Sequence, residues 1–125
     1  MQESNSLFRS DNYSEVGWWQ DNSAVGGSAS LHEVGKLKAN QLGIYDMSGN
    51  VGEWCYDYGV PYGYEYSLEP ETDPIGPAEN LNDTKIYRGG YFSTYDTKGK
   101  VYYTDKMDPT ATYDTIGFRV VRTIK

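Results

Sequence analysis

Two acidic side chains flank the turn that is most clearly marked by turn-forming residues, within residues 40–57. Asp46 and Glu53 lie on either side of a Ser-Gly-Asn turn at residues 48–50. A tight turn brings backbone carbonyl oxygens together, and carboxylate and carbonyl oxygens in a flexible arrangement are the ligands that calcium prefers. This spacing therefore predicts a hard-cation site. In the alternative interpretation, the two carboxylates only accept hydrogen bonds from amides of the turn.

Catalytic nucleophiles are scarce in this chain. Cys55 is the only cysteine and His32 is the only histidine. A single cysteine excludes an intrachain disulfide, and one histidine without a flanking signature does not indicate a Ser/His/Asp or Cys/His arrangement. We interpret Cys55 as a small buried apolar residue and His32 as a surface residue.

A tyrosine-rich polar stretch runs from residue 91 to residue 115. Tyr, Thr and Asp supply 15 of its 25 positions but only 17 of the other 100. In binding loops, Tyr gives rigid amphipathic contact area and small polar residues give adaptable hydrogen bonds. The stretch therefore predicts a surface that binds a protein or another macromolecule, with a solvated loop as the alternative. The candidate ligand-binding residues are Tyr91, Ser93, Tyr95, Tyr102, Tyr103, Asp105 and Tyr113.

Length, charge and hydropathy limit the classes of partner and compartment. The 125 residues are enough for a single small domain, residues 1–125. A net charge of -7 argues against nucleic acid as a partner. No apolar run is long enough to span a membrane, and the first twenty residues do not read as a signal peptide. The compartment stays open, and display at the cell surface or outside the cell would require a longer precursor.

Turn-forming residues predict an irregular structure. The 14 Gly and 5 Pro make long helices improbable. We expect little regular structure in residues 1–40 and a long surface loop over residues 57–84. Runs of β-branched and aromatic residues predict three short strands, at residues 51–56, 85–88 and 118–122.

Three motifs in a fixed order carry a family resemblance. Residues 42–54 read Leu-Gly-Ile-Tyr-Asp-Met-Ser-Gly-Asn-Val-Gly-Glu-Trp, residues 88–90 read Arg-Gly-Gly and residues 116–120 read Ile-Gly-Phe-Arg-Val. In this order and spacing, the chain resembles the C-terminal half of the formylglycine-generating enzyme (sulfatase-modifying factor) domain family. The resemblance implies an α+β, irregular C-type-lectin-like fold with short antiparallel strands and little regular secondary structure.

The resemblance also implies a cofactor. It assigns a structural calcium ion to the side chains of Asp46 and Glu53 and the backbone carbonyls of Gly49 and Val51. The family's second calcium site is expected to be lost, because Gly26 stands where an acidic ligand would be.

The family's oxidases hold copper with two cysteines that follow the Arg-Gly-Gly motif, since thiolates suit Cu(I). Residues 91–115 contain no cysteine, and Cys55 precedes the motif. We therefore predict a protein that binds no copper and is not an enzyme.

The chain departs from the family pattern in its packing residues. Gly52 stands where the family usually has Trp, and Tyr91 and Phe92 follow Arg-Gly-Gly in place of Ser-Trp. Loss of a large buried side chain ordinarily costs about 3 to 5 kcal/mol unless another group refills the space. The family's N-terminal half is also missing here, and self-association is one way to complete the core.

The chain further resembles C-type-lectin-like variable proteins of diversity-generating retroelements, which diversify the stretch between Arg-Gly-Gly and Gly-Phe-Arg. We interpret it as a non-catalytic ligand-binding module that displays a variable surface between Arg88 and Gly117. One alternative is a fragment or subunit of a formylglycine-generating-type oxidase acting on protein thiols. A sugar-binding lectin ranks last, because Glu69-Pro70-Glu71 only approximates the lectin Glu-Pro-Asn signature.

Overall fold

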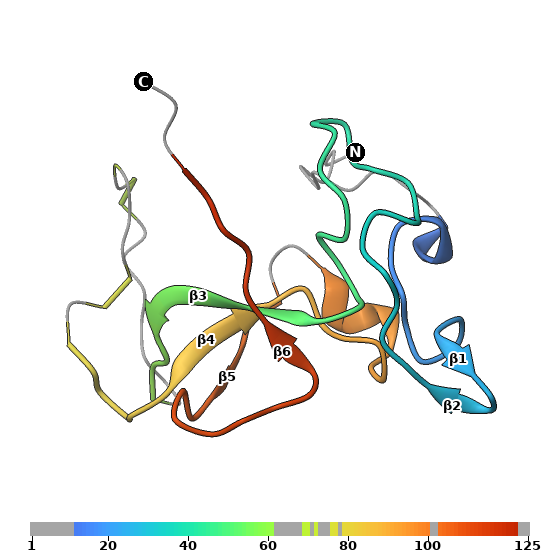
Figure 1. Cartoon of the computed structure of the whole chain (residues 1–125). Coiled ribbons are helices and arrows are strands. Elements are labelled where there is room, and N and C mark those ends of the chain that lie inside the picture. The colour runs from blue at the N-terminus through green and yellow to red at the C-terminus, as the bar shows by residue number, and fades with distance from the viewer. Residues whose placement is uncertain are drawn as a thin grey trace.

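The computed structural model describes residues 12–61, 69–70, 72, 76–77, 79–100 and 103–122. In these ranges the regular structure consists of short 3-10 helices and short strands (Figure 1). The elements are η1 (Tyr13–Glu15), β1 (Ala24–Val25), β2 (Ser28–Ala29), β3 (Gly52–Tyr58), β4 (Lys85–Arg88), η2 (Asp96–Gly99), β5 (Asp105–Met107) and β6 (Ile116–Gly117). No α-helix occurs in the described part of the chain, in line with the high content of Gly and Pro.

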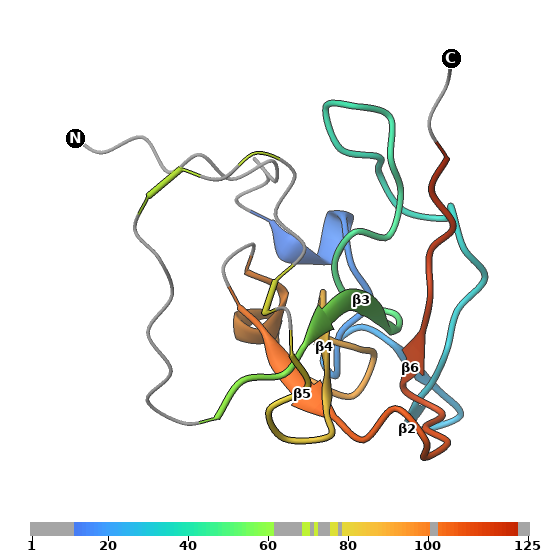
Figure 2. The ribbon, with the colours of Figure 1, turned by 90° about the vertical axis from the view of Figure 1, so that its left-hand side faces the viewer.

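A four-stranded sheet in the order β5-β4-β3-β6 forms the centre of the fold (Figure 2). β4 pairs antiparallel with both β3 and β5, and β3 pairs in parallel with β6. The register sets Trp54 opposite Tyr87, and Tyr87 opposite Asp105. Because directly paired residues point to the same face of a sheet, these three side chains form one row across β3, β4 and β5.

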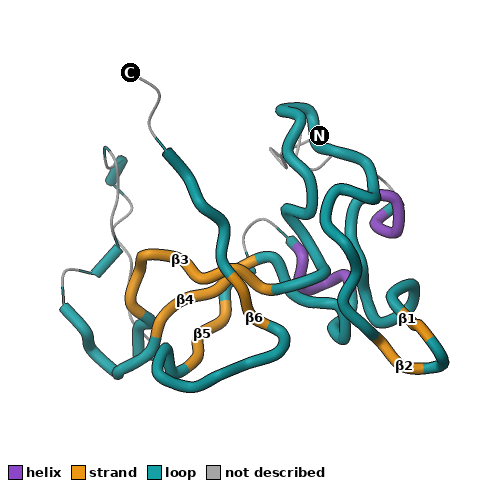
Figure 3. The backbone as a smooth tube through the Cα atoms, in the orientation of Figure 1, coloured by secondary structure: helices purple, strands orange, loops and turns teal. Residues whose placement is uncertain are grey.

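Two of the three predicted strands are present. β4 covers the predicted residues 85–88, and β3 begins one residue later than predicted and extends to Tyr58. The predicted strand at 118–122 is wrong, because the pairing between β3 and β6 covers only the residues opposite Ile116 and Gly117. Beyond Gly117 the chain runs away from the sheet as a loop (Figure 3). Strand propensity without a neighbouring strand does not make a strand.

The N-terminal loops pack onto the segment that follows Arg-Gly-Gly. Trp19 is buried, and its indole Nε1 donates to the Tyr13 carbonyl at 3.3 Å. A Cβ on Gly90 would lie 3.0 Å from the Trp19 ring, and one on Gly99 would overlap it. The Gln20 amide donates to the Thr94 carbonyl at 3.0 Å. Trp19 therefore holds residues 90–99 in place through glycines that leave room for its ring.

Asn50, in the predicted turn, joins three segments. Its side chain accepts from the His32 amide and donates to the His32 carbonyl, both at 3.0 Å. Its backbone amide donates to the Trp18 carbonyl, and its carbonyl accepts from the Phe92 amide, both at 2.9 Å. Asn50 is buried with a φ of 62°, a conformation that Asn tolerates better than most residues.

His32 does not lie free on the surface as the sequence suggested. Its ring stacks on Trp18 with the centroids 3.7 Å apart and an interplanar angle of 8°. Its Nε2 lies 2.9 Å from the Ser23 carbonyl oxygen, which requires this nitrogen to be the donor. His32 is thus part of the packing between the N-terminal loops and the turn.

The space expected from the missing Trp at position 52 is filled. A Cβ on Gly52 would lie 2.8 Å from Cδ2 of Tyr87 and 2.9 Å from Cδ1 of Ile116. Gly52 itself is buried. The ring of Tyr87 and the side chain of Ile116 therefore occupy the volume that a larger residue would need. The loss of stability expected from an unfilled space at position 52 does not apply.

Candidate ligand-binding face and cation turn

Trp54, Tyr87 and Asp105 form the floor of the candidate site. The Trp54 and Tyr87 rings meet edge to face at 6.4 Å and 84°. The Tyr87 hydroxyl donates to Oδ2 of Asp105 at 3.2 Å. Tyr87 is only 4% exposed, and burial, followed by the charge of Asp105, raises its pKa. The phenol therefore stays neutral and remains a hydrogen-bond donor.

Asp105, in the floor, is one of the predicted ligand-binding residues, and three others gather around it. The Tyr91 ring lies 6.4 Å from Tyr87, and the Tyr113 ring lies 6.4 Å from Trp54. The Tyr103 hydroxyl donates to Oδ2 of Asp105 at 3.1 Å. We call this cluster the aromatic face; it consists of Trp54, Tyr87, Tyr91, Lys98, Tyr103, Asp105 and Tyr113.

Lys98 adds a positive charge to the aromatic face. Its ammonium lies 3.6 Å from Oδ2 of Asp105 and 4.4 Å from the centroid of the Tyr103 ring. Burial acts to raise the pKa of Asp105, but the Lys106 amide, the hydroxyls of Tyr103 and Tyr87 and the charge of Lys98 together lower it. At neutral pH the face therefore presents a carboxylate, an ammonium and phenol hydroxyls among partly buried rings.

The remaining predicted contact residues lie elsewhere. Ser93 and Tyr95 are exposed in the loop that precedes η2, outside the sheet. Tyr102 lies outside the described residues. Sequence reasoning missed Trp54, Tyr87 and Lys98 as members of the face. The positions of Trp54 and Tyr87 within predicted strands were visible, but which face they share was not.

The turn predicted to bind a cation brings its acidic residues to one open pocket of about 560 Å³. Asp46 is 9% exposed, and its Oδ2 accepts from the Gly35 amide at 2.7 Å. Its Oδ1 is buried and has no hydrogen-bond partner in the described part of the chain. Val51 and Glu53 line the same pocket. Gly49 instead packs against Trp18, where a Cβ would lie 2.8 Å from the Trp18 backbone nitrogen.

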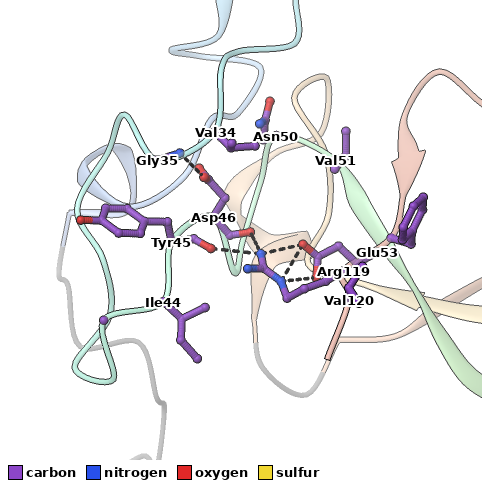
Figure 4. A pocket seen from close by; sticks show the side chains of 12 residues that line it. Val34, Gly35, Ile44, Tyr45, Asp46, Asn50, Val51, Glu53, Arg119 and Val120 are labelled. Carbon is purple, nitrogen blue, oxygen red and sulfur yellow. Dashed lines mark hydrogen bonds and ion pairs between the residues drawn. The ribbon is translucent and has the colours of Figure 1, made fainter. Parts of the chain in front are cut away.

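Arg119 forms hydrogen bonds with both carboxylate oxygens of Glu53 in this pocket (Figure 4). Its Nε donates to both carboxylate oxygens, at 3.1 and 3.0 Å, and its Nη2 donates to Oε1 at 2.7 Å. The same Nη2 lies 3.0 Å from the carbonyl oxygens of Tyr45 and Asp46. Of the carboxylate oxygens of Asp46 and Glu53, Asp46 Oδ1 is the one without a hydrogen-bond partner in the described part of the chain. The four predicted calcium ligands, as arranged, therefore do not fit one ion together, and calcium stays a prediction.

Comparison with known proteins decides the family. The model of the sulfatase-modifying factor enzyme 1-like domain matches residues 3–124. The chain belongs to this family. The sulfatase-modifying factor assignment confirms the resemblance carried by the three motifs.

Relatives of the sulfatase-modifying factor domain have diverse names. The formylglycine-generating enzyme of Streptomyces coelicolor is 31% identical over 101 residues, which is 78% of this chain and 31% of the enzyme. The serine/threonine-protein kinase pkn1 of Chlamydia caviae is 36% identical over 99 residues, 78% of this chain and 16% of the kinase. The chaperone protein LppX of Paenibacillus barcinonensis is 38% identical over 89 residues, 71% of this chain and 26% of the chaperone. The chain thus spans less than a third of each relative.

Solved structures confirm the fold of this sulfatase-modifying factor domain. Treponema denticola variable protein 1 matches with a TM-score of 0.68 and 29% identity, over 84% of this chain and 35% of that one. CarF matches with a TM-score of 0.61 and 28% identity, over 92% of this chain and 36% of that one. The predicted irregular C-type-lectin-like fold is therefore correct, and it is mostly β.

No helix among the described residues has the length and apolarity to cross a bilayer. Within the same ranges, no three His, Cys, Asp or Glu side chains gather as a metal cluster. The calcium set predicted from the resemblance uses only two acidic side chains, so this second finding does not test it.

Proposed function

We propose that this domain is a non-catalytic ligand-binding module, and that the aromatic face is its contact surface. The observation that carries the proposal is the convergence of Tyr91, Tyr103, Asp105 and Tyr113 on one side of the sheet. These residues come from a stretch of the chain that lies between Arg88 and Gly117. Rigid aromatic rings with a few fixed polar groups are the composition of binding surfaces.

The solved neighbour named a variable protein supports a variable version of this surface. In the face, Trp54 and Tyr87 belong to β3 and β4, whereas the other members come from the stretch after Arg-Gly-Gly. Because Trp54 and Tyr87 lie outside that stretch, the residues around them could vary while β3 and β4 stay the same. We infer that residues 91–115 are the diversified segment, and that the ligand is a protein or another macromolecule.

The state of Cys55 supports the non-catalytic proposal. Its thiol lies half-buried in β3. Burial raises the pKa of Cys55, and this effect outweighs the nearby charge of Arg88, which lowers it. Because the thiolate is the reactive and metal-binding form of cysteine, a thiol that stays protonated is a poor nucleophile and a poor copper ligand.

A paired binding experiment tests the contact surface. The chain, immobilised on a sensor, would be exposed to an array of purified extracellular proteins alongside two variants, Tyr113→Ala and Tyr56→Ala. Tyr56 is a matched control because it is an exposed tyrosine in β3 outside the aromatic face. We expect Tyr113→Ala to weaken binding of the selected partner by roughly 2 kcal/mol, and Tyr56→Ala to leave it unchanged. Equal losses in both variants, or no selective binder, would count against the aromatic face.

The match to the formylglycine-generating enzyme favours a second candidate, a fragment or subunit of a thiol oxidase. This candidate predicts Cu(I) binding that depends on cysteine. Titration with Cu(I) in competition with a chromogenic chelator would measure it in the wild type and in Cys55→Ser. Tight binding that is lost in Cys55→Ser would favour the oxidase, whereas weak binding of equal strength in both proteins favours the binding module.

We also propose that a second copy of this chain covers its most exposed apolar segment. Phe118, Val120 and Val121 are 78%, 81% and 85% exposed, directly after β6. The chain spans about a third of the length of the solved neighbours. Exposed apolar side chains in such density favour association, and antiparallel pairing of two copies of residues 118–122 would also satisfy the backbone.

A further inference from the structure

The guanidinium of Arg119 faces the oxygens of the predicted calcium site, which we call the cation turn (residues 45–53). Arg119 donates to both carboxylate oxygens of Glu53, with Nε–Oε2 at 3.0 Å and Nη2–Oε1 at 2.7 Å. It also donates to the carbonyl oxygens of Tyr45 and Asp46, at 3.0 Å each. A bidentate carboxylate with backbone carbonyls is a typical ligand set for calcium. In Figure 4 the side chain of Arg119 fills the space between these oxygens.

The match is one of shape as well as charge. The planar guanidinium offers two parallel N–H donors that fit a carboxylate, and a lysine ammonium in its place would act only as a point charge. Hydrogen bonding to Glu53 raises the pKa of Arg119, so the guanidinium is charged at neutral pH. The ion pair is only partly shielded, since the side chains of Arg119 and Glu53 are 32% and 23% exposed.

The same guanidinium also balances Asp46. The negative charge of Asp46 contributes to the raised pKa of Arg119, and the hydrogen bond from Arg119 goes to the Asp46 backbone carbonyl. A calcium ion bound by Glu53 would compete for oxygens that Arg119 already holds, and it would lie next to a fixed positive charge. Like charges at such short range repel each other.

We propose that Arg119 is the resident cation of this turn, and that the chain holds the turn without calcium. The arginine lies in the Ile-Gly-Phe-Arg motif, 66 residues after Glu53. It therefore ties the end of the stretch that carries Tyr113 back onto the turn before β3. This role does not depend on the proposed function, because it concerns the scaffold and not the ligand.

Thermal unfolding, followed by circular dichroism with CaCl2 or with EDTA, tests the proposal. We expect the Tm of the wild type to be the same in both buffers. Arg119→Gln should lower the Tm by roughly 5 to 10 °C, because it removes charge-assisted hydrogen bonds and leaves Glu53 unpaired. Arg122→Gln is the matched control, an exposed arginine on the same segment with the same change of charge. Its Tm should stay within about 2 °C of the wild type.

Arg119→Lys keeps the test decisive if Arg119→Gln does not fold. Lysine retains the positive charge but lacks the two parallel N–H donors of the guanidinium, so the Tm of Arg119→Lys should fall below that of Arg122→Gln. Two results would overturn the proposal. One is a wild-type Tm that rises by several degrees with CaCl2, returns with EDTA and loses this response in Asp46→Ala. The other is an Arg119→Lys or Arg119→Gln variant whose Tm equals that of Arg122→Gln.

Discussion

Replacing Gly52 with alanine tests whether Tyr87 and Ile116 really fill the space of the family's Trp. An alanine Cβ at this position would lie 2.8 Å from the Tyr87 ring and 2.9 Å from Cδ1 of Ile116. Contacts below 3.0 Å force one group to move. Tyr87 is held by its hydrogen bond to Asp105, so the end of the Ile116 side chain has to yield.

The expected cost follows from two opposing effects. Overpacking a filled core costs about 1 to 3 kcal/mol, and exchanging glycine for alanine in a strand recovers about 0.5 to 1 kcal/mol. Taking the middle of both ranges, Gly52→Ala should lower the free energy of unfolding by about 1 kcal/mol, and by about 2.5 kcal/mol at most. Gly117→Ala is the matched control in the neighbouring strand, because its Cβ would meet only Val51, at 3.3 Å. It should stay within about 0.5 kcal/mol of the wild type.

Urea unfolding followed by tryptophan fluorescence measures both variants, with the m-value checking that the unfolded state is unchanged. A double mutant adds a second test. Ile116→Val removes Cδ1, the atom that Gly52→Ala would strike, so the two changes together should cost at least about 0.5 kcal/mol less than their sum. The reasoning fails if Gly52→Ala is as stable as Gly117→Ala, or if the two changes at positions 52 and 116 are additive.

Three further outcomes follow from the structure. Asn50→Ala should lower the free energy of unfolding by about 3 kcal/mol in the same urea assay, because the buried Asn50 amide is lost and the part-buried amide and carbonyl of His32 lose their partner; a loss below about 1 kcal/mol would contradict this. Sedimentation velocity should show concentration-dependent association of the wild type that Val120→Glu abolishes and that Val25→Glu, on the exposed β1 strand, retains; a monomeric wild type would exclude the second copy. The lowered pKa of Asp105 contributes stability that is present above its unfolded pKa of about 3.9 and is lost as pH falls through the folded pKa. The difference in Tm between the wild type and Asp105→Asn should therefore shrink below pH of about 4, and a constant difference would show that the charge has no role.

Local sequence patterns determined the family, the turn and the central strands. The motif that contains Asp46 and Glu53 sets the turn, since its Ser-Gly-Asn residues suit the positive φ found at Gly49 and Asn50. Residues 85–88 form a strand where β-branched and aromatic residues predicted one. The concentration of Tyr, Thr and Asp after Arg88 also located much of the aromatic face, because these residue types report the chemistry of a surface before its shape is known.

Pairings between distant residues were decided only by the tertiary structure. β5 forms from Asp105, Lys106 and Met107, which have little strand propensity, because these residues pair antiparallel with β4. The segment 118–122 has that propensity and forms no strand, because β3 provides partners only for Ile116 and Gly117.

The same limit applies to the candidate site. Trp54 and Tyr87 join the aromatic face through a register that no local pattern specifies, and Glu53 meets Arg119 across 66 residues. The sequence by itself therefore determined which groups are available and the turn that presents some of them. Which groups meet was decided by long-range packing, since contacts between distant segments depend on the whole chain.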